Sequence, residues 1–414
     1  MTTSMAAKHA ASKRLKDAIF GASAACAEAA KKYGADKVTN ATMGVMIDDE
    51  GKLASIPTME RVFRSLSIED YTRYAPIPGL PDYLDAVIDL TFAEQKPEGY
   101  LGAIATAGGT GAIHHAVANY AERGDKVLTA DWFWGTYNVI CNECGCQLTN
   151  YQLFDENQNF NIADYTAKVD EIMKQQDSLL VIINTPAHNP TGFSLTEEDW
   201  DNVLALTKKY ASQGKKMSIL VDIAYIDYSY NLERSRDYMN AFNRMNDQVM
   251  IVVAFSCSKT LTSYGLRCGG AVILARNQED VRALEILMEK HARASWSNIP
   301  NAAMENFVKV TTEHKDEFNE EKGKYVDLLR QRCEVFKKEA DECGLTYYPY
   351  KEGFFVTLKV EDDDLLTRFH EAMLAQDIYT IKVNKGIRVA LCSLSVEKCQ
   401  GLAFKMKEIL DSLK

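Results

Sequence analysis

The sequence predicts an α/β fold: a large domain with a mostly parallel sheet between helices, joined to a smaller α+β domain. From about residue 100 to 275, short apolar runs alternate with amphipathic helical stretches, a pattern typical of parallel strands covered on both faces. After residue 300 the pattern changes to long charged helices and short strands. A chain of 414 residues with 46% hydrophobic content is long enough for a sizeable core in more than one lobe.

The large domain is expected to contain six strands, which are short runs rich in Val, Ile, Leu and Ala. They lie at residues 103–107, 126–130, 179–184, 218–224, 249–255 and 270–275. Helical stretches such as "GAIHHAVANYAER" and "TEEDWDNVLALTKKYASQ" separate them, as expected for crossover connections between parallel strands.

The small domain is expected to follow the helical region of residues 300–340. Its strands lie in "TYYPYKEGFFVTLKV" and "IYTIKVNKGIRVALC", on either side of a helix near 363–376 and before a terminal helix. We assign residues 50–315 to the large domain. Residues 316–414, with an N-terminal segment at 1–49, form the small domain.

Bulk composition narrows the function classes. A net charge of −11 argues against a non-specific nucleic-acid binder, and no apolar run approaches the ~20 residues that span a bilayer. The basic, small-residue start at residues 1–16 is expected to be an amphipathic helix, with a targeting peptide as the alternative. We therefore expect a cytoplasmic protein that binds neither nucleic acid nor membrane.

Ten cysteines occur without a regular framework. Cys141, Cys144 and Cys146 in "CNECGC" resemble half of a zinc site, but no second pair follows at the usual spacing. Reduced thiols in a reducing compartment, with no metal, are the simpler interpretation.

Candidate ligand-binding residues follow the predicted strands, because ligands of doubly wound sheets bind at the carboxyl ends of strands. "GGTGA" opens a helix after the first run, and Gly109, Thr110 and Gly111 there offer close backbone approach, a hydroxyl and free N–H groups. These are typical of an anion site, although glycine before a helix is often only a turn.

The next strand ends carry groups suited to a flat ring. Trp134, in the cluster "WFWGTY", is either a packing residue or a stacking platform. Asn189 in "HNPTG" either caps a turn or presents an amide to a ligand. Asp222 lies at the end of an apolar strand, three residues before Tyr225, where a carboxylate is costly unless a cation pairs with it.

Lys259 ends the fifth predicted strand in the uncharged surroundings "SCSKTLTSYG". A surface lysine is the ordinary alternative, but a desolvated lysine has a lowered pKa and forms Schiff bases. Arg267, eight residues on, can bind a phosphate together with Ser256 and Ser258.

These groups together describe one ligand, a planar, phosphorylated aromatic aldehyde with a protonatable ring nitrogen: pyridoxal phosphate. Lys259 would form the Schiff base, and Asp222 would keep the ring nitrogen protonated so that the ring acts as an electron sink. Trp134 would stack on the ring, and Asn189 and Tyr225 would hold its hydroxyl.

The sequence also resembles the aspartate and aromatic aminotransferases, class I members of the fold-type I pyridoxal-phosphate enzymes, from about residue 17 to the C-terminus. The resemblance implies a seven-stranded type of sheet in the large domain and a homodimer with shared active sites. Its markers occur in the family's order and spacing; they are "YAPIPGLPDY", "TAGGTGA", "HNPTG", "DIAY", "SCSK" with Arg267, "RASWSNIP" and "GIRVALC".

The resemblance implies further roles. Arg388 would bind the substrate α-carboxylate, assisted by Asn189 and the backbone at Gly44. Tyr74 would reach the cofactor phosphate of the neighbouring subunit. Arg293 would cross the interface to the substrate's distal carboxylate, with Ser297 and Asn298 in the same loop.

Two positions depart from the family's pattern. Tyr137 stands where the family usually has a histidine three residues after the stacking tryptophan. Asn184 replaces another histidine, five residues before Asn189. Both histidines lie behind the carboxylate in relatives, so the tuning of the cofactor is expected to differ here.

We expect transamination by a ping-pong mechanism, with aspartate and 2-oxoglutarate as first-choice substrates, because two arginines would select a dicarboxylate. An aromatic or dual-specificity aminotransferase is the near alternative. A lyase or decarboxylase on the same scaffold is more distant. A non-catalytic regulator would need a DNA-binding module, for which residues 1–16 are too short.

Overall fold

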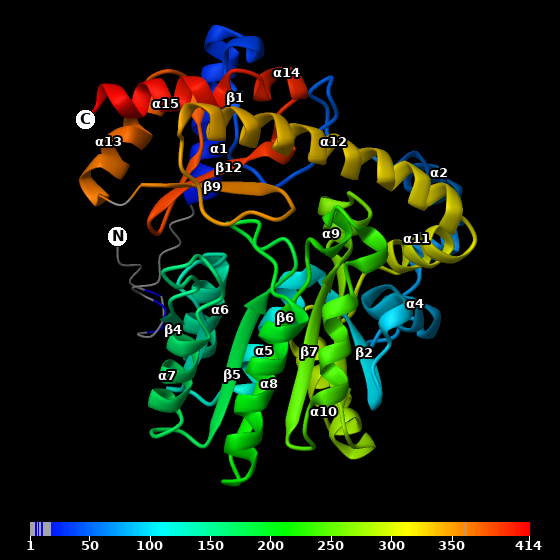
Figure 1. The fold of residues 1–414 in the computed structure, drawn as a ribbon. Coiled ribbons are helices and arrows are strands. Elements are labelled where there is room, and N and C mark those ends of the chain that lie inside the picture. The colour runs from blue at the N-terminus through cyan, green and yellow to red at the C-terminus, as the bar shows by residue number, and fades with distance from the viewer. Residues whose placement is uncertain (1–4, 6, 8–9, 11–17, 361) are drawn as a thin grey trace.

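The computed structural model describes residues 5, 7, 10, 18–360 and 362–414 (Figure 1). The helix expected at residues 1–16 therefore lies almost wholly outside the described residues. The predicted α/β class is confirmed, with one large sheet between helices and smaller sheets beneath a group of C-terminal helices (Figure 1).

The large sheet has seven strands in the order β2-β8-β7-β6-β5-β3-β4. β8 runs antiparallel to its neighbours β2 and β7, while the remaining neighbours pair in parallel. The strands are Tyr100–Ala107 (β2), Lys126–Ala130 (β3), Gln147–Tyr151 (β4), Ser178–Asn184 (β5), Lys216–Asp222 (β6), Val249–Ser256 (β7) and Cys268–Ala275 (β8).

All six predicted runs are strands, and β4 is the one that the hydrophobic pattern missed. β4 lies at the edge of the sheet, and only its last residue, Tyr151, is buried. Such a strand needs no continuous apolar run, so periodicity gives no signal for it.

The two faces of the sheet explain why the central strands are apolar throughout. In β5, Leu179, Val181 and Ile183 pack into one helical layer, and Leu180 and Ile182 into the other, since successive side chains of a strand point to opposite faces. The first layer contains Pro81–Phe92 (α4), Ile162–Ile172 (α7), Glu197–Ala211 (α8) and Asn301–Thr312 (α11); the second contains Gly108–Tyr120 (α5), Thr136–Cys144 (α6) and Gln278–Ser295 (α10).

The second hydrophobic core forms between the C-terminal helices and a three-stranded antiparallel sheet in the order β11-β12-β9. A two-stranded parallel sheet joins β1 to β10, so the N-terminal segment contributes to this half. The elements are Thr39–Asn40 (β1), Phe355–Lys359 (β9), Ile378–Tyr379 (β10), Ile381–Val383 (β11), Gly386–Ala390 (β12), Ala18–Tyr33 (α1), Lys315–Cys343 (α12), Asp363–Leu374 (α13), Val396–Cys399 (α14) and Leu402–Ser412 (α15).

The long helix α12 runs across both halves of the molecule (Figure 1). It contacts α11 and α2 (Pro57–Ser65) as well as α14 and α15. Two shorter helices, Ile68–Thr72 (α3) and Cys257–Thr260 (α9), complete the set. The domain boundaries at residues 49/50 and 315/316 stay a prediction.

Three features bear on the composition arguments. No helix in the described part of the chain is long and apolar enough to cross a membrane. All ten cysteines are free, with Cys141 and Cys146 buried. Across residues 18–360 and 362–414, no group of three or more His, Cys, Asp or Glu side chains is arranged to hold a metal ion.

Gly192, in the loop after β5, gives a test of the packing between the two halves. Its φ is +75°, and a Cβ there would overlap the Tyr350 ring and lie 2.8 Å from the Glu352 carbonyl oxygen. We expect Gly192→Ala to lower the free energy of unfolding by about 3 kcal/mol, from the left-handed backbone and the overlap together.

Gly214→Ala is the matched control, because Gly214 has φ +74° and nothing within 4 Å of an added Cβ. It should cost only about 1 kcal/mol. Thermal unfolding midpoints measured side by side check the difference. Equal midpoints for the two variants would show that the Tyr350 contact is not tight.

Candidate active site

One cavity of about 320 Å³ lies where the carboxyl ends of β5, β6 and β7 meet the start of α5. It brings together most of the residues predicted from the sequence. Those lining it are Gly44, Gly109, Thr110, Trp134, Asn189, Asp222, Tyr225, Ser256, Ser258, Lys259, Arg267 and Arg388.

Three predicted residues are not among those that line this cavity in the described chain. Gly111 is buried in α5, where an added Cβ would lie 3.1 Å from the Trp296 ring. Tyr74 is 91% exposed. Arg293 is exposed and donates a hydrogen bond of 2.5 Å to the Ser297 hydroxyl. The roles expected for Tyr74 and Arg293 need a second copy of the chain, so they stay predictions.

Lys259 lies in α9, directly after β7. Its amine donates a hydrogen bond of 2.8 Å to the Gly44 carbonyl and lies 4.5 Å from the centre of the Tyr264 ring. Burial lowers the pKa of the Lys259 amine to about 8, and the positive charges of Arg267 and Arg388 act in the same direction. At a pKa of about 8, roughly a tenth of the amine is neutral, and therefore nucleophilic, at pH 7.

Asp222 is the last residue of β6 and is 5% exposed. One carboxylate oxygen accepts a hydrogen bond of 2.6 Å from the Tyr137 hydroxyl, and the other accepts one of 3.1 Å from the backbone N–H of Ala224. Burial raises the pKa of Asp222, while these hydrogen bonds and the charge of Lys259 oppose the rise. A cation placed against this carboxylate would stabilise its charged form.

The two departures from the family's pattern lie on either side of Asp222. Tyr137 contacts the carboxylate itself, as above. Asn184 instead donates a hydrogen bond of 2.8 Å to the Asp222 backbone carbonyl, and its amide oxygen accepts one of 2.7 Å from the Asn189 N–H. Asn184 thus fixes the loop that carries Asn189, and Tyr137 is the group that tunes the carboxylate.

A corner suited to an anion lies at the N-terminus of α5, a helix of 13 residues whose first N–H groups, including those of Gly109 and Thr110, have no partner within the helix. Arg267 donates a hydrogen bond of 3.3 Å to the Ser258 hydroxyl. A Cβ at Gly108 would lie 2.7 Å from an Arg267 nitrogen. Glycine at 108 therefore leaves room for the guanidinium beside the helix terminus.

A second cationic corner forms around Arg388 of β12, which is 3% exposed. Its guanidinium donates hydrogen bonds of 3.1 Å to the Asn189 amide oxygen and 2.6 Å to the Thr42 carbonyl, and it lies 4.4 Å from the centre of the Phe355 ring. The Asn189 amide also donates a 3.4 Å hydrogen bond to the Tyr225 hydroxyl. Asn189 therefore connects Arg388 to Tyr225 across the cavity.

Several lining residues had no sequence signal. Tyr264 accepts a hydrogen bond of 2.8 Å from the Met46 N–H and packs against the Lys259 amine, and Phe355 covers Gly44. Both come from short loops or strands whose aromatic residues look like ordinary core residues. A larger cavity, of about 870 Å³, shares Trp134, Asn189 and Arg388 with the first.

Comparison with known proteins agrees with this geometry. The model of the family "Aminotransferase class I and II" matches residues 36–405. The chain is 34% identical to an aminotransferase of Anaerococcus prevotii whose structure superposes with a TM-score of 0.93, covering 98% of this chain and 100% of that one. It is 24% identical over 366 residues to the mitochondrial aspartate aminotransferase of Gallus gallus, covering 84% of each chain. An aromatic amino acid aminotransferase of Burkholderia cenocepacia, 20% identical, superposes with a TM-score of 0.79 over 97% of this chain and 98% of that one.

The fold and the site define a fold-type I enzyme that depends on pyridoxal phosphate. The chain belongs to the class I and II aminotransferase family and is an aminotransferase. The site fits the cofactor on its own evidence. It offers one corner suited to an anion, one lysine with a lowered pKa and one buried carboxylate whose charged form a cation would stabilise.

Tyr137→Phe tests how Asp222 is tuned. Loss of the 2.6 Å hydrogen bond should raise the pKa of Asp222 further, so that more of the carboxyl is neutral and the protonated ring nitrogen is held less well. We expect the dissociation constant for pyridoxal phosphate to rise roughly tenfold, measured by equilibrium dialysis.

Tyr165→Phe is the matched control. Tyr165 is also fully buried, and its hydroxyl has no hydrogen-bond partner in the described part of the chain. Its affinity for the cofactor should stay at the wild-type value. If both variants bind the cofactor as tightly as the wild type, Tyr137 has no tuning role.

Proposed function

We propose that this aminotransferase moves the amino group of an L-amino acid, with aspartate as first choice, to a 2-oxo acid, with 2-oxoglutarate as first choice. The observation that carries the proposal is a single cavity lined by Lys259, Arg267 and Arg388 around the one carboxylate of Asp222. Three cations facing one anion suit a ligand set that contains a phosphate and carboxylates.

Lys259 would be the covalent and proton-transferring residue. Pyridoxal phosphate, when bound, supplies an electron sink for the bonds at the substrate Cα. The Lys259 amine would hold the cofactor covalently, and, once a substrate amine had displaced it, would be the base that takes the proton from the substrate Cα and the acid that gives a proton back. A pKa of about 8 suits both directions of this transfer.

The other residues would bind and orient. Asp222 would pair with the ring nitrogen, Trp134 would stack on the ring, and Asn189 and Tyr225 would hold the ring hydroxyl. Ser256, Ser258 and Arg267, with the N–H groups of α5, hold the phosphate. Arg388 binds the substrate α-carboxylate through its planar fork of donors.

Preference for a dicarboxylate would come from Arg293 of a second subunit, which makes the proposal one for a homodimer with shared sites. An aromatic or dual-specificity enzyme is the second candidate. It is favoured by the apolar part of the cavity wall, where Ile19, Phe20 and Phe355 lie. Without a distal carboxylate, Arg293 would have to turn away from such a substrate.

Lys259→Ala tests the covalent step. Borohydride should no longer fix pyridoxal phosphate to the chain, and kcat should fall by about 10²–10⁴-fold or more. Peptide mass spectrometry after reduction measures the first effect. Lys324→Ala is the control, since Lys324 is an exposed residue paired with Glu320. Cofactor that is still fixed in Lys259→Ala would refute the assignment.

Arg293→Leu tests the choice of substrate. We expect kcat/KM for aspartate to fall about 10- to 100-fold, the value of a charge-assisted pair, and kcat/KM for phenylalanine to change less than about threefold. Steady-state kinetics with both amino acids measure the ratio. Equal losses would remove Arg293 from substrate selection.

Mixing Arg293→Leu chains with Lys259→Ala chains tests whether Arg293 acts across an interface. A hybrid dimer would contain one site with both residues intact, so aspartate activity should return to a fraction of the wild-type value. Activity that is only the sum of the two separate variants would place Arg293 outside a shared site.

A further inference from the structure

The segment that carries Lys259 is too short to be rigid alone. α9 contains four residues, Cys257–Thr260, and its backbone is closed by a hydrogen bond of 3.0 Å from the Leu261 N–H to the Cys257 carbonyl. A single helical turn is not stable by itself. The direction of the Lys259 side chain must therefore depend on what holds this turn in place.

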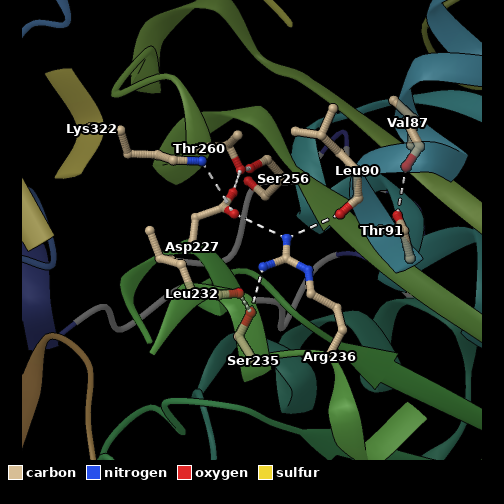
Figure 2. A network of polar contacts seen from close by, with 10 residues as sticks. All are labelled: Val87, Leu90, Thr91, Asp227, Leu232, Ser235, Arg236, Ser256, Thr260 and Lys322. Atoms are coloured by element: carbon tan, nitrogen blue, oxygen red, sulfur yellow. Dashed lines mark hydrogen bonds and ion pairs between the residues drawn. The ribbon is translucent and has the colours of Figure 1, made fainter. Parts of the chain in front are cut away.

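Thr260, the residue after Lys259, is held by a buried carboxylate (Figure 2). Its hydroxyl donates a hydrogen bond of 2.6 Å to one oxygen of Asp227. Both residues are almost fully buried, at 2% and 3% exposure. Asp227 follows Tyr225 by two residues, within the 3-10 turn Ile226–Tyr228. The contact thus joins the Lys259 turn to the segment of Tyr225.

The second oxygen of Asp227 faces two cations (Figure 2). Arg236 donates a hydrogen bond of 3.0 Å to it, and the Lys322 amine lies 3.4 Å away. Arg236 is fixed in turn by a 3.0 Å hydrogen bond to the Leu90 carbonyl. Burial alone would raise the pKa of Asp227, but Lys322, Arg236 and the Thr260 hydroxyl lower it. The carboxylate is therefore charged and has little freedom to turn.

The two oxygens of Asp227 thus have separate partners. One is neutralised by cations that come from α12 and from the loop after β6, and the other is left for Thr260. If this network served only stability, well-packed apolar side chains in its place would stabilise the fold equally well. The polar arrangement fixes one hydrogen bond beside the reactive lysine.

We infer that Asp227 is a positioning residue, which acts through Thr260 to hold Lys259 at the angle from which its amine meets the cofactor aldehyde. The inference rests on the proposed role of Lys259. It adds a residue outside the cavity, because Asp227 and Thr260 are not among the residues that line it.

Thr260→Val is the decisive variant, because it removes the hydroxyl, keeps the branched shape and leaves Asp227 paired with its two cations. Asp227→Asn is less suitable, since it leaves Arg236 and Lys322 buried without their counter-charge and threatens folding. Thr260→Ser keeps the hydroxyl, so it is the variant that should behave like the wild type. Thr91→Val is the control, because Thr91 is fully buried and, among the residues that the structure describes, its hydroxyl bonds only the Val87 carbonyl (Figure 2).

Two readouts do not depend on the amino acid substrate. The first is the timed capture of pyridoxal phosphate by the full-length, cofactor-free chain, in which borohydride reduces the C=N bond between the cofactor and Lys259 and the modified Lys259 is counted by mass spectrometry. The second is the pH profile for acetylation of Lys259 by acetic anhydride without cofactor. Thr260→Val should capture the cofactor about 10- to 100-fold more slowly, since small misplacements of reacting groups have effects of this size. The midpoint of its acetylation profile should move from about pH 8, the pKa of Lys259 in the wild type, toward the higher midpoint of an ordinary lysine.

Thr260→Ser should return both readouts to within about threefold of the wild type, and Thr91→Val should leave them unchanged. Capture by Thr260→Val at the wild-type rate, or a loss no larger than that of Thr91→Val, would overturn the inference. So would an unchanged acetylation profile. If Lys259→Ala still fixes the cofactor, the proposed function itself fails, which is a separate result.

Discussion

The buried amine of Lys259 is the constraint on which the rest of the site depends. Lys259 lies directly after β7, an interior strand of the large sheet, and its amine donates its hydrogen bond to the carbonyl of Gly44, which belongs to the N-terminal segment near the small sheets. An ammonium group in that position is disfavoured by burial and by two nearby arginines. The fold thus keeps the amine between the large sheet and the N-terminal segment, where burial itself makes it reactive.

The charges of the cavity are opposite to those of the chain as a whole. The protein carries a net charge of −11, yet Lys259, Arg267 and Arg388 line the cavity with Asp222 as its carboxylate. Anionic groups are therefore drawn to one place on an otherwise acidic molecule. Arg267 and Arg388 lie in separate corners with different partners, which allows a phosphate and a carboxylate to bind at the same time without exchanging places.

The sequence predicted much of this site because strand ends are visible in a hydrophobic pattern. Lys259, Asp222 and Asn189 each follow an apolar run, and parallel strands bring such ends together. The edge strand β4 was missed because it is half exposed. Tyr264 and Phe355 were missed because an aromatic residue in a loop has the same pattern whether it packs in a core or against a reactive amine. Tyr137 was noted only as a departure, and its hydrogen bond to Asp222 could not be derived from spacing, since 85 residues separate the two.

Helix α12 supports the two segments on which the position of Lys259 depends, the turn that carries the lysine and the segment that bears Gly44. Lys322, near its start, faces Asp227 and so supports the turn that carries Lys259. Arg332, ten residues further along and fully buried, donates hydrogen bonds of 3.0 Å to the Ile47 carbonyl and 3.1 Å to the Cys392 carbonyl. Because Lys322 and Arg332 are ten residues apart, the helix holds their backbones about 15 Å apart along its axis. Helix α12 thus contacts the network that holds the Lys259 turn, through Lys322 and Asp227, and the segment that bears Gly44, through Arg332 and the Ile47 carbonyl.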